Sequence, residues 1–306
     1  MFRYLAKRLG ASAVILVGIT VVTFLLLYVI PADPVAMIAG RNATAETREQ
    51  LRHQLFLDRP LIEQYGRYVA RLARGDLGRS YAQKTEVSYL IWSRLPATLL
   101  LMLGAITAEL MIGLPAGIYA ATRRGSRADR MVMIASFASV SAPQFVVGML
   151  LLYLFAAKLN WFPLSGYGSF SHLVLPALTL GLAGGGWYSR VMRSSMMDVM
   201  RQDYVRTARA KGLSEWRVVM THAFRNAVLP VIAMIGLDIG VFMAGAVVVE
   251  SVYGWPGIGQ LAWQAIQRVD GPIIMGVTLV AAIAIVLANL LADLITPLID
   301  PRIKLR

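Results

Sequence analysis

Two acidic residues lie inside long uncharged stretches of the sequence. They are Glu109, within residues 96–121, and Asp238, within residues 226–249. A charged side chain in an apolar helix is costly, so each is a candidate for function by default. These carboxylates could line a pathway for a cationic or peptidic solute, or they could form hydrogen-bonded contacts between helices. The contact between helices is the more common role, and both readings stay open at this point.

Other chemistries find little support in the sequence. The chain has no cysteine, which excludes disulfides, thiolate metal sites and cysteine nucleophiles. Its three histidines are far apart, and only His172 has serines close by, Ser165 and Ser171, which makes a weak hydrolase candidate. None of the five lysines follows a glycine, so the Gly-x-x-x-x-Gly-Lys loop that cradles ATP is missing. We therefore expect no catalytic residue, no metal and no cofactor bound by this chain.

The composition indicates which elements carry the two carboxylates. Hydrophobic residues make up 57% of the 306 residues and charged residues 15%, whereas soluble domains contain about 45–50% and about 25%. The excess predicts lipid-facing surface. A helix needs about 20 apolar residues to cross the hydrocarbon core. Six stretches of suitable length predict six transmembrane helices: 9–30, 96–121, 131–157, 173–189, 226–249 and 271–292.

The distribution of basic residues predicts the orientation. Lysine and arginine are enriched in cytoplasmic loops. With the N-terminus inside, the short cytoplasmic segments hold 18 basic residues, while the two short outer loops hold only Lys158 and Arg268. Both termini are therefore expected on the cytoplasmic side of the membrane. The net charge of +13 then reflects basic loops rather than binding to nucleic acid.

The span pattern also predicts the organisation of the chain. Within the extramembrane part, Thr44 is expected to cap an amphipathic helix, and a second helix is expected from Leu61 to Leu72, ending at Gly75. The expected parts are a tail and first span (1–30), an extracytoplasmic segment (31–95), a membrane core (96–297) with a cytoplasmic segment (190–225), and a cytoplasmic tail (298–306).

The cytoplasmic segment 190–225 is too basic to span a membrane, yet it is patterned like helices. Val205, Ala208 and Trp216 recur at helical spacing. Gly212 suits the end of one helix and Ser214 the start of the next. Such an element can lie on lipid headgroups or insert apolar side chains into a groove on a partner. The pattern alone does not separate these two roles.

The same segment resembles a known loop. Residues 204–214, Tyr-Val-Arg-Thr-Ala-Arg-Ala-Lys-Gly-Leu-Ser, resemble the cytoplasmic EAA-type loop of ABC-importer permeases. The most similar family is the B-type membrane subunit of the dipeptide, oligopeptide and nickel importers. At 206–208 Arg-Thr-Ala replaces the general Glu-Ala-Ala, as in the peptide branch. Further matches lie along the chain in the family's order: 33–34, 55–61, 64–65, 75–80, 95–99, His222, 225–226, 229–230, 249–250, 255–259 and 300–303.

This resemblance implies an all-α polytopic protein with the type I ABC importer (MetI-like) permease fold. It implies a non-catalytic permease that translocates dipeptides, oligopeptides or glutathione-like peptides, with nickel chelates or opines as alternatives. The implied partners are a second homologous permease in a heterodimer, two cytosolic ATPases that bind ATP and magnesium, and an extracytoplasmic substrate-binding protein. The residues that it marks for coupling to the ATPases are Tyr204, Val205, Ala208, Gly212, Leu213, Ser214 and Trp216.

A helix-breaking turn after the fifth span is a candidate outer gate, although a plain turn is favoured; its residues are Glu250, Trp255, Pro256, Gly257 and Gly259. The alternative class is an autonomous secondary transporter driven by protons through Glu109 and Asp238. It would need no basic docking segment, and the lack of an internal repeat disfavours it.

Overall fold

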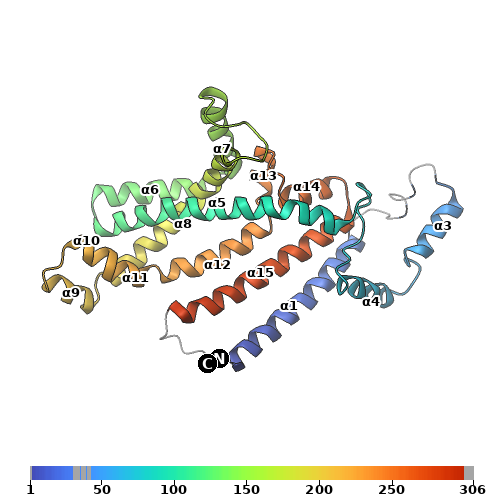
Figure 1. Cartoon of the computed structure of the whole chain (residues 1–306), viewed down its shortest axis with the longest axis horizontal. Helices are drawn as coiled ribbons and strands as arrows, with labels where there is room; N and C mark the ends of the chain where they lie inside the picture. The colour runs from blue at the N-terminus through green and yellow to red at the C-terminus, as the bar shows by residue number, and fades with distance from the viewer. Residues whose placement is uncertain (1, 30–34, 36–38, 40–42, 300–306) are drawn as a thin grey trace. The chain divides into compact units, whose positions relative to one another are not determined.

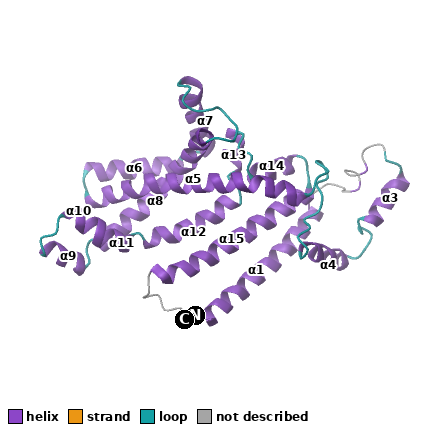
Figure 2. Ribbon diagram, viewed as in Figure 1, coloured by secondary structure: helices purple, strands orange, loops and turns teal. Residues whose placement is uncertain are grey.

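The computed structural model describes residues 2–29, 35, 39 and 43–299, with only the backbone considered at 2–7, 26–29 and 291–299. Every regular element in these ranges is helical, with one isolated bridge between Arg79 and Glu86 (Figures 1 and 2). The predicted Asp33-Pro34 match and the end of the C-terminal tail, 300–306, lie outside the described residues. The chain forms two compact units.

The first unit comprises Met1–Thr98, Met243–Val247 and Pro256–Val286. Its core lies where the start of α5 meets α14 and α15, and it includes Ile91, Leu261 and Ile273. The helices that contribute to this unit are α1 (Phe2–Val29), α3 (Ala45–Gln54), α4 (Leu61–Leu72), α5 (Val87–Thr122), α14 (Ile258–Gln267) and α15 (Gly271–Ile299).

Two predicted helices of the extramembrane segment are confirmed. Thr44 caps α3 by accepting a hydrogen bond from the backbone N–H of Thr47 at 3.2 Å, which satisfies a donor of the first turn. Helix α4 has the predicted bounds, and the chain leaves it through Gly75, whose φ of 77° lies in the left-handed region that glycine tolerates. Local capping signals therefore predicted both elements.

The second unit comprises Leu99–Phe242, Val248–Trp255 and Leu287–Arg306. Its core gathers Tyr188, Met192 and Met196 of α8 with Val219 and Val231. Besides the rest of α5 and of α15, its elements are α6 (Arg127–Ser141), α7 (Gln144–Leu151), the π-helical η1 (Leu152–Lys158), α8 (Phe170–Val199), α9 (Asp203–Ala210), α10 (Glu215–Arg217), the π-helical η2 (Val218–Ala223), α11 (Phe224–Ala227), α12 (Leu229–Met243) and α13 (Val247–Tyr253).

Small residues bring α5 and α8 into close contact. A Cβ on Gly104 would lie 3.1 Å from Ala177, and a Cβ on Gly113 or Gly117 would overlap the backbone of α8 near Gly185 and Ser189. The residue numbers rise together along both helices, so α5 and α8 run parallel. Close approach through small residues is a common way to join helices in a membrane.

Length and composition identify fewer straight spans than predicted. Three helices qualify alone, at Arg8–Leu25, Val87–Thr122 and Gly271–Leu290, and two bent pairs raise the number to five within the described residues. The fourth predicted span, 173–189, falls within α8, which contains Pro176 and three consecutive glycines and does not meet the same criterion. Helix α5 also begins at Val87, inside the predicted extracytoplasmic segment.

Two predicted spans are broken, and proline explains both. The third, 131–157, bends by 102° between α6 and α7, where Ala142 is extended ahead of Pro143 because a residue before proline avoids the helical region. The fifth, 226–249, bends by 49° between α11 and α12. Pro230 cannot donate the hydrogen bond that would continue the helix there. The prediction of continuous helices was wrong at these two places.

Candidate functional site

The cytoplasmic segment folds as a helical elbow, by which we mean residues 203–223. Helix α9 ends before Gly212, whose φ is 74°, and α10 begins after Ser214. A Cβ added at Gly212 would meet no atom within 4 Å. The requirement for glycine is therefore the left-handed backbone and not space. The predicted order of helix, glycine turn and helix is confirmed.

The apolar side of α9 is covered by the chain itself. Val205 is 0% exposed, and with Ala208 and Val218 it forms a cluster against which Leu213 packs. The sequence left two roles open for this apolar face: contact with lipid headgroups, or insertion of side chains such as Val205 and Leu213 into a groove on a partner. In the structure, Val205 and Ala208 hold α9 against η2, because burying these side chains within the chain removes apolar surface from water. The helical spacing showed an apolar face without showing what would cover it.

Polar contacts hold the elbow across its glycine turn and at its entry. Arg209 donates to the two carboxylate oxygens of Glu215 at 3.1 and 2.6 Å, and this hydrogen bonding holds the pKa of Glu215 below its ordinary value. Asn226 donates from its amide to the Tyr204 hydroxyl at 2.8 Å. The elbow is thus fixed across the glycine turn and at its entry.

Two aromatic side chains of the elbow face outward. Trp216 is 75% exposed and Tyr204 is 43% exposed. Neither belongs to the cluster around Val205. They are the two large apolar side chains of the elbow that lie exposed on this chain.

An ion pair that the sequence did not predict joins α6 to α8. Arg193 donates to both oxygens of the buried Asp129, at 2.6 and 2.8 Å. Asp129 also accepts from the Gly125 backbone at 2.9 Å, while its own N–H binds Ser126. The Ser-x-x-Asp spacing is a helix-start signal that was available in the sequence. No local pattern in the sequence indicated its partner Arg193, which lies 64 residues away.

The two intramembrane carboxylates contact neighbouring helices. Glu109 is 3% exposed and packs against Gly184 of α8, where any side chain would overlap it. Its Oε2 atom has no hydrogen-bond partner among the described residues. The Tyr188 hydroxyl of α8 donates to the carboxylate of Asp238, which is half-buried. Both side chains therefore take part in helix contacts, the role that the sequence favoured.

The predicted outer-gate turn begins in the second unit, where its first residues are tightly packed. Glu250 and Trp255 are fully buried, and the Trp255 backbone donates to the Glu250 carbonyl at 2.8 Å. The Trp255 ring meets Tyr167 edge-on at 4.9 Å. After Pro256, Gly257 lies just before α14, and the Gly259 backbone contacts Gly245 in the first unit. The local geometry is that of a tightly packed turn.

A second contact missed by the sequence anchors the loop before α5. Asp270 is fully buried and accepts hydrogen bonds from the Ser80 hydroxyl and from the backbone of Tyr81 and Ala82, the last at 3.0 Å. Since Asp270 is 190 residues from Ser80, no local pattern could have linked them.

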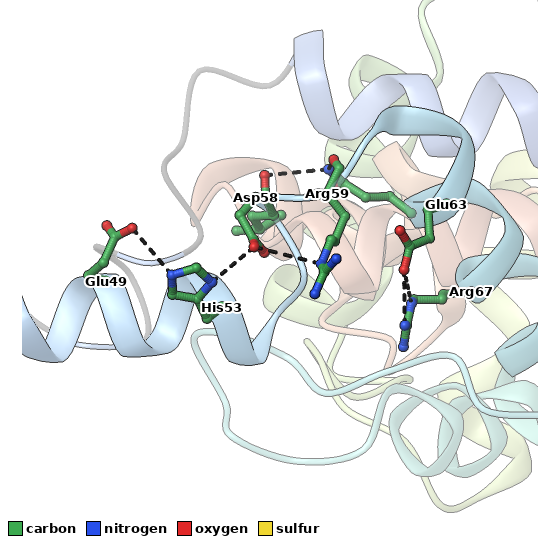
Figure 3. A network of polar contacts seen from close by, with 8 residues as sticks. Glu49, His53, Asp58, Arg59, Glu63 and Arg67 are labelled. Atoms are coloured by element: carbon green, nitrogen blue, oxygen red, sulfur yellow. Dashed lines mark hydrogen bonds and ion pairs between the residues drawn. The ribbon is translucent and has the colours of Figure 1, made fainter.

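The turn between α3 and α4 carries an exposed polar network (Figure 3). His53 contacts Asp58 at 2.9 Å and Glu49 at 3.7 Å. Arg67 pairs with Glu63 at 3.0 Å. Within the described residues, no three histidine or acidic side chains are arranged to hold a metal ion.

The fold defines the class of the protein. The chain matches a solved inward-facing structure of the MetNI methionine ABC transporter with a TM-score of 0.60, at 15% identity, over 69% of this chain and 96% of that one. A second crystal form of that transporter gives 0.58 at 16% identity, with the same coverage. The predicted fold class, an all-α membrane protein with an ABC importer permease fold, is confirmed.

The family follows from the sequence match. Residues 113–305 match the binding-protein-dependent transport system inner membrane component, and residues 1–102 match the N-terminal part of such membrane components. The chain belongs to this family of permeases. It is 39% identical over 289 residues to the "Glutathione transport system permease protein GsiC" of Escherichia coli K12, covering 94% of both chains. It is 40% identical over 318 residues to the "Di/tripeptide transport system permease protein DppB" of Pseudomonas aeruginosa, covering 94% of this chain and 95% of that one.

Several predictions are confirmed by this membership. The chain is a multi-pass inner-membrane permease of a binding-protein-dependent ABC importer, and it is a non-catalytic subunit that works with ATPase and binding-protein partners. The autonomous proton-driven transporter, the alternative of a different class, is replaced by this assignment.

Proposed function

We propose that this permease translocates short peptides, including glutathione-like tripeptides, into the cytoplasm. The observation that carries the proposal is the relatedness of the whole chain to permeases named for glutathione and for di- and tripeptides, at 39–40% identity over 94% of its length. A permease that is similar over nearly its full length to the permeases of two peptide systems is best suited to solutes of the same chemistry.

The proposed assembly contains four kinds of subunit. This chain pairs with a second, homologous permease, two ATPases bind the pair from the cytoplasm, and a substrate-binding protein docks outside. Magnesium and ATP belong to the ATPases, since this chain has no glycine before any lysine and so no phosphate loop. Both termini lie in the cytoplasm, and residues 31–95 lie outside, as the basic residues of the short loops indicate.

The elbow is the proposed contact with an ATPase. Trp216 and Tyr204 supply an exposed aromatic anchor on a segment that is otherwise closed on itself, and aromatic side chains dominate the energetics of many interfaces. When the ATPases close on ATP, their grooves draw the elbow with them, and the spans rock to open the pathway outward. Release of ADP and phosphate returns the pathway to the inside.

The pathway and the outer turn retain their proposed residues. Asp238 is half-buried and so remains a candidate for contact with a solute, whereas the buried Glu109 supports the helix packing beside it. Glu250, Trp255, Pro256, Gly257 and Gly259 form the candidate outer turn.

Transport by the reconstituted complex tests the substrate. Both permeases, the ATPases and the binding protein are placed in proteoliposomes with ATP on the ATPase side. We expect ATP-dependent uptake of labelled glutathione or of di- and tripeptides. Uptake of a nickel chelate or an opine with no uptake of peptides would overturn the peptide assignment. The purified chain alone serves as the control and should hydrolyse no ATP.

A further inference from the structure

Arg190 on α8 holds its guanidinium beside two aromatic rings. Its Cζ atom lies 4.8 Å from the centre of the Phe137 ring on α6 and 4.6 Å from that of Trp187 on α8. Both aromatic side chains are more than half exposed. A guanidinium stacked on a ring uses its face, so the N–H groups along its edge can still bind an anion. The stacking therefore positions this cation without neutralising it.

The part of the chain that the structure describes supplies no acceptor for this cation. The Nε atom of Arg190 is buried and has no hydrogen-bond partner there, and no carboxylate of the described residues forms an ion pair with the guanidinium. Asp129 on α6 gives both of its oxygens to Arg193. A buried donor without an acceptor is rare in folded proteins, so a partner from outside the chain is expected.

A second arginine lies on the neighbouring side of α6. Arg130 is exposed and likewise forms no ion pair with the described residues. Ile134 and Phe137, both exposed, follow it at helical spacing on the same side of α6. With Trp187 and Arg190 of α8, these three side chains form what we call the α6–α8 surface. It combines two positive charges with exposed apolar groups and holds no acid.

The contacts between α6 and α8 place the two arginines at similar levels. A Cβ on Gly186 of α8 would overlap the carbonyl of Ser136, whereas Arg193 reaches Asp129. The residue numbers thus run in opposite directions, so the two helices, which lie side by side in Figure 1, are antiparallel. Interpolation between these two contacts sets the arginines within about one helical turn of each other.

That level is the edge of the uncharged part of both helices. Arg130 directly precedes the uncharged run 131–157, and Arg190 directly follows the uncharged run 173–189. Because α6 and α8 are antiparallel, these two ends lie on the same side of the membrane. Basic residues next to a span extend their charge to the lipid headgroups, and tryptophan is enriched at the same level. The α6–α8 surface is therefore placed at a headgroup layer.

We propose that Arg130 and Arg190 bind the phosphate of an anionic phospholipid at the α6–α8 surface. Arginine forms strong, charge-assisted hydrogen bonds with phosphate oxygens, and basic pockets between membrane helices suit anionic headgroups. Ile134, Phe137 and Trp187 lie beside the acyl chains, which favours a lipid over a free anion. In the proposed orientation, this lipid belongs to the cytoplasmic leaflet. The inference rests on α6 and α8 lying in the membrane and holds for any transported solute.

Lipid binding by the complete transporter, ATPases included, tests the proposal. The complex is delipidated in detergent and titrated with phosphatidylglycerol, and the bound lipid is counted by native mass spectrometry. Arg190→Gln and Arg130→Gln each remove one charge from the α6–α8 surface. Arg201→Gln removes the same charge from an exposed position beyond the end of α8 and is the matched control. Co-purification of the ATPases verifies each variant, and the exposed Arg130 keeps the test open if Arg190→Gln does not assemble.

Phosphatidylcholine and inorganic phosphate identify what the surface recognises. We expect the unsubstituted and Arg201→Gln complexes to bind phosphatidylglycerol equally. The affinity of one lipid site should fall about tenfold or more in Arg190→Gln and in Arg130→Gln. Phosphatidylcholine, which has no net charge, should bind that site more weakly, and inorganic phosphate should not displace the lipid.

Three results would overturn the proposal. Equal binding of phosphatidylglycerol by all variants would show that the two arginines do not hold a lipid. Displacement of the lipid by inorganic phosphate would indicate an anion site in which acyl chains have no part. Absence of phosphatidylglycerol from the unsubstituted complex would mean that another subunit covers the α6–α8 surface.

Discussion

Gly212 is the residue at which backbone geometry most directly limits the elbow. Its φ of 74° lies where a β-branched residue is strained, at a cost of about 1–3 kcal/mol. We predict that Gly212→Val inserts normally in the membrane but co-purifies with much less ATPase, because the turn between α9 and α10 is distorted. The measurement is the ATPase recovered with the tagged permease pair.

Asparagine provides the control at the same position. It adopts the left-handed region more readily than other residues, and a side chain here meets open space. Gly212→Asn should therefore retain most of the assembly. If valine were tolerated as well as asparagine, the turn would not matter for binding the ATPases.

Trp216 is expected to be the main anchor of the elbow. Removing an aromatic anchor from an interface costs about 2 kcal/mol or more, roughly a 30-fold loss of affinity. We predict a loss of this size in ATPase binding for Trp216→Ala. Trp92, 68% exposed on α5 outside the elbow, is a matched control, and Trp92→Ala should bind normally. Equal affinities for both variants would favour the alternative that the elbow lies on lipid headgroups.

At the scale of elements, the Asp129–Arg193 pair holds the start of α6 against α8. Breaking a buried ion pair from one side costs about 3 kcal/mol or more, because the remaining charge has lost its partner. Asp129→Ala and Arg193→Ala should each lower the melting temperature of the purified complex. The double variant should lose clearly less than the sum of the two. Additive losses would show that the pair is not a coupled unit.

Asp270 similarly holds the loop before α5. In Asp270→Ala, the buried Ser80 hydroxyl loses its acceptor, at a cost of about 1–3 kcal/mol. The backbone N–H of the exposed Ala82 loses the same acceptor and can bond water instead. The loop carries Arg79 and Lys84, so its release should expose it to trypsin. The control is Asp76→Ala, which removes only an exposed bond to the Gly78 backbone within the loop. Cleavage at equal rates in both variants would argue against the anchor.

The elements also show where sequence reasoning succeeds and fails. Helices α3 and α4 were predicted because their start and stop signals are local, as at Thr44 and Gly75. The bend at Pro143 was missed because an uncharged run looks continuous when only length and hydropathy are counted. The two anchors at Asp129 and Asp270 join residues 64 and 190 positions apart, and no spacing rule reaches that far.

At the scale of the whole molecule, the orientation can be tested with exposed positions that make no capping bond. In spheroplasts, an impermeant thiol reagent should label Gln50→Cys but reach Arg124→Cys only after permeabilisation, because the basic loops are expected inside. The unsubstituted chain has no cysteine and is the blank. The opposite pattern of labelling would reverse the orientation.

With the elbow as the proposed contact with an ATPase, the burial of Val205 and Ala208 within the chain also affects how the transporter is assembled. A docking segment that folds only on binding must be ordered at that moment, which weakens association. Here the ordering is complete before any ATPase arrives, since the cluster and the Arg209–Glu215 pair belong to this chain alone. Docking can then be a rigid-body event, and ATPases can leave and be exchanged without unfolding the permease. Variation at Tyr204 and Trp216 would change which ATPase is accepted while the fold beneath stays the same.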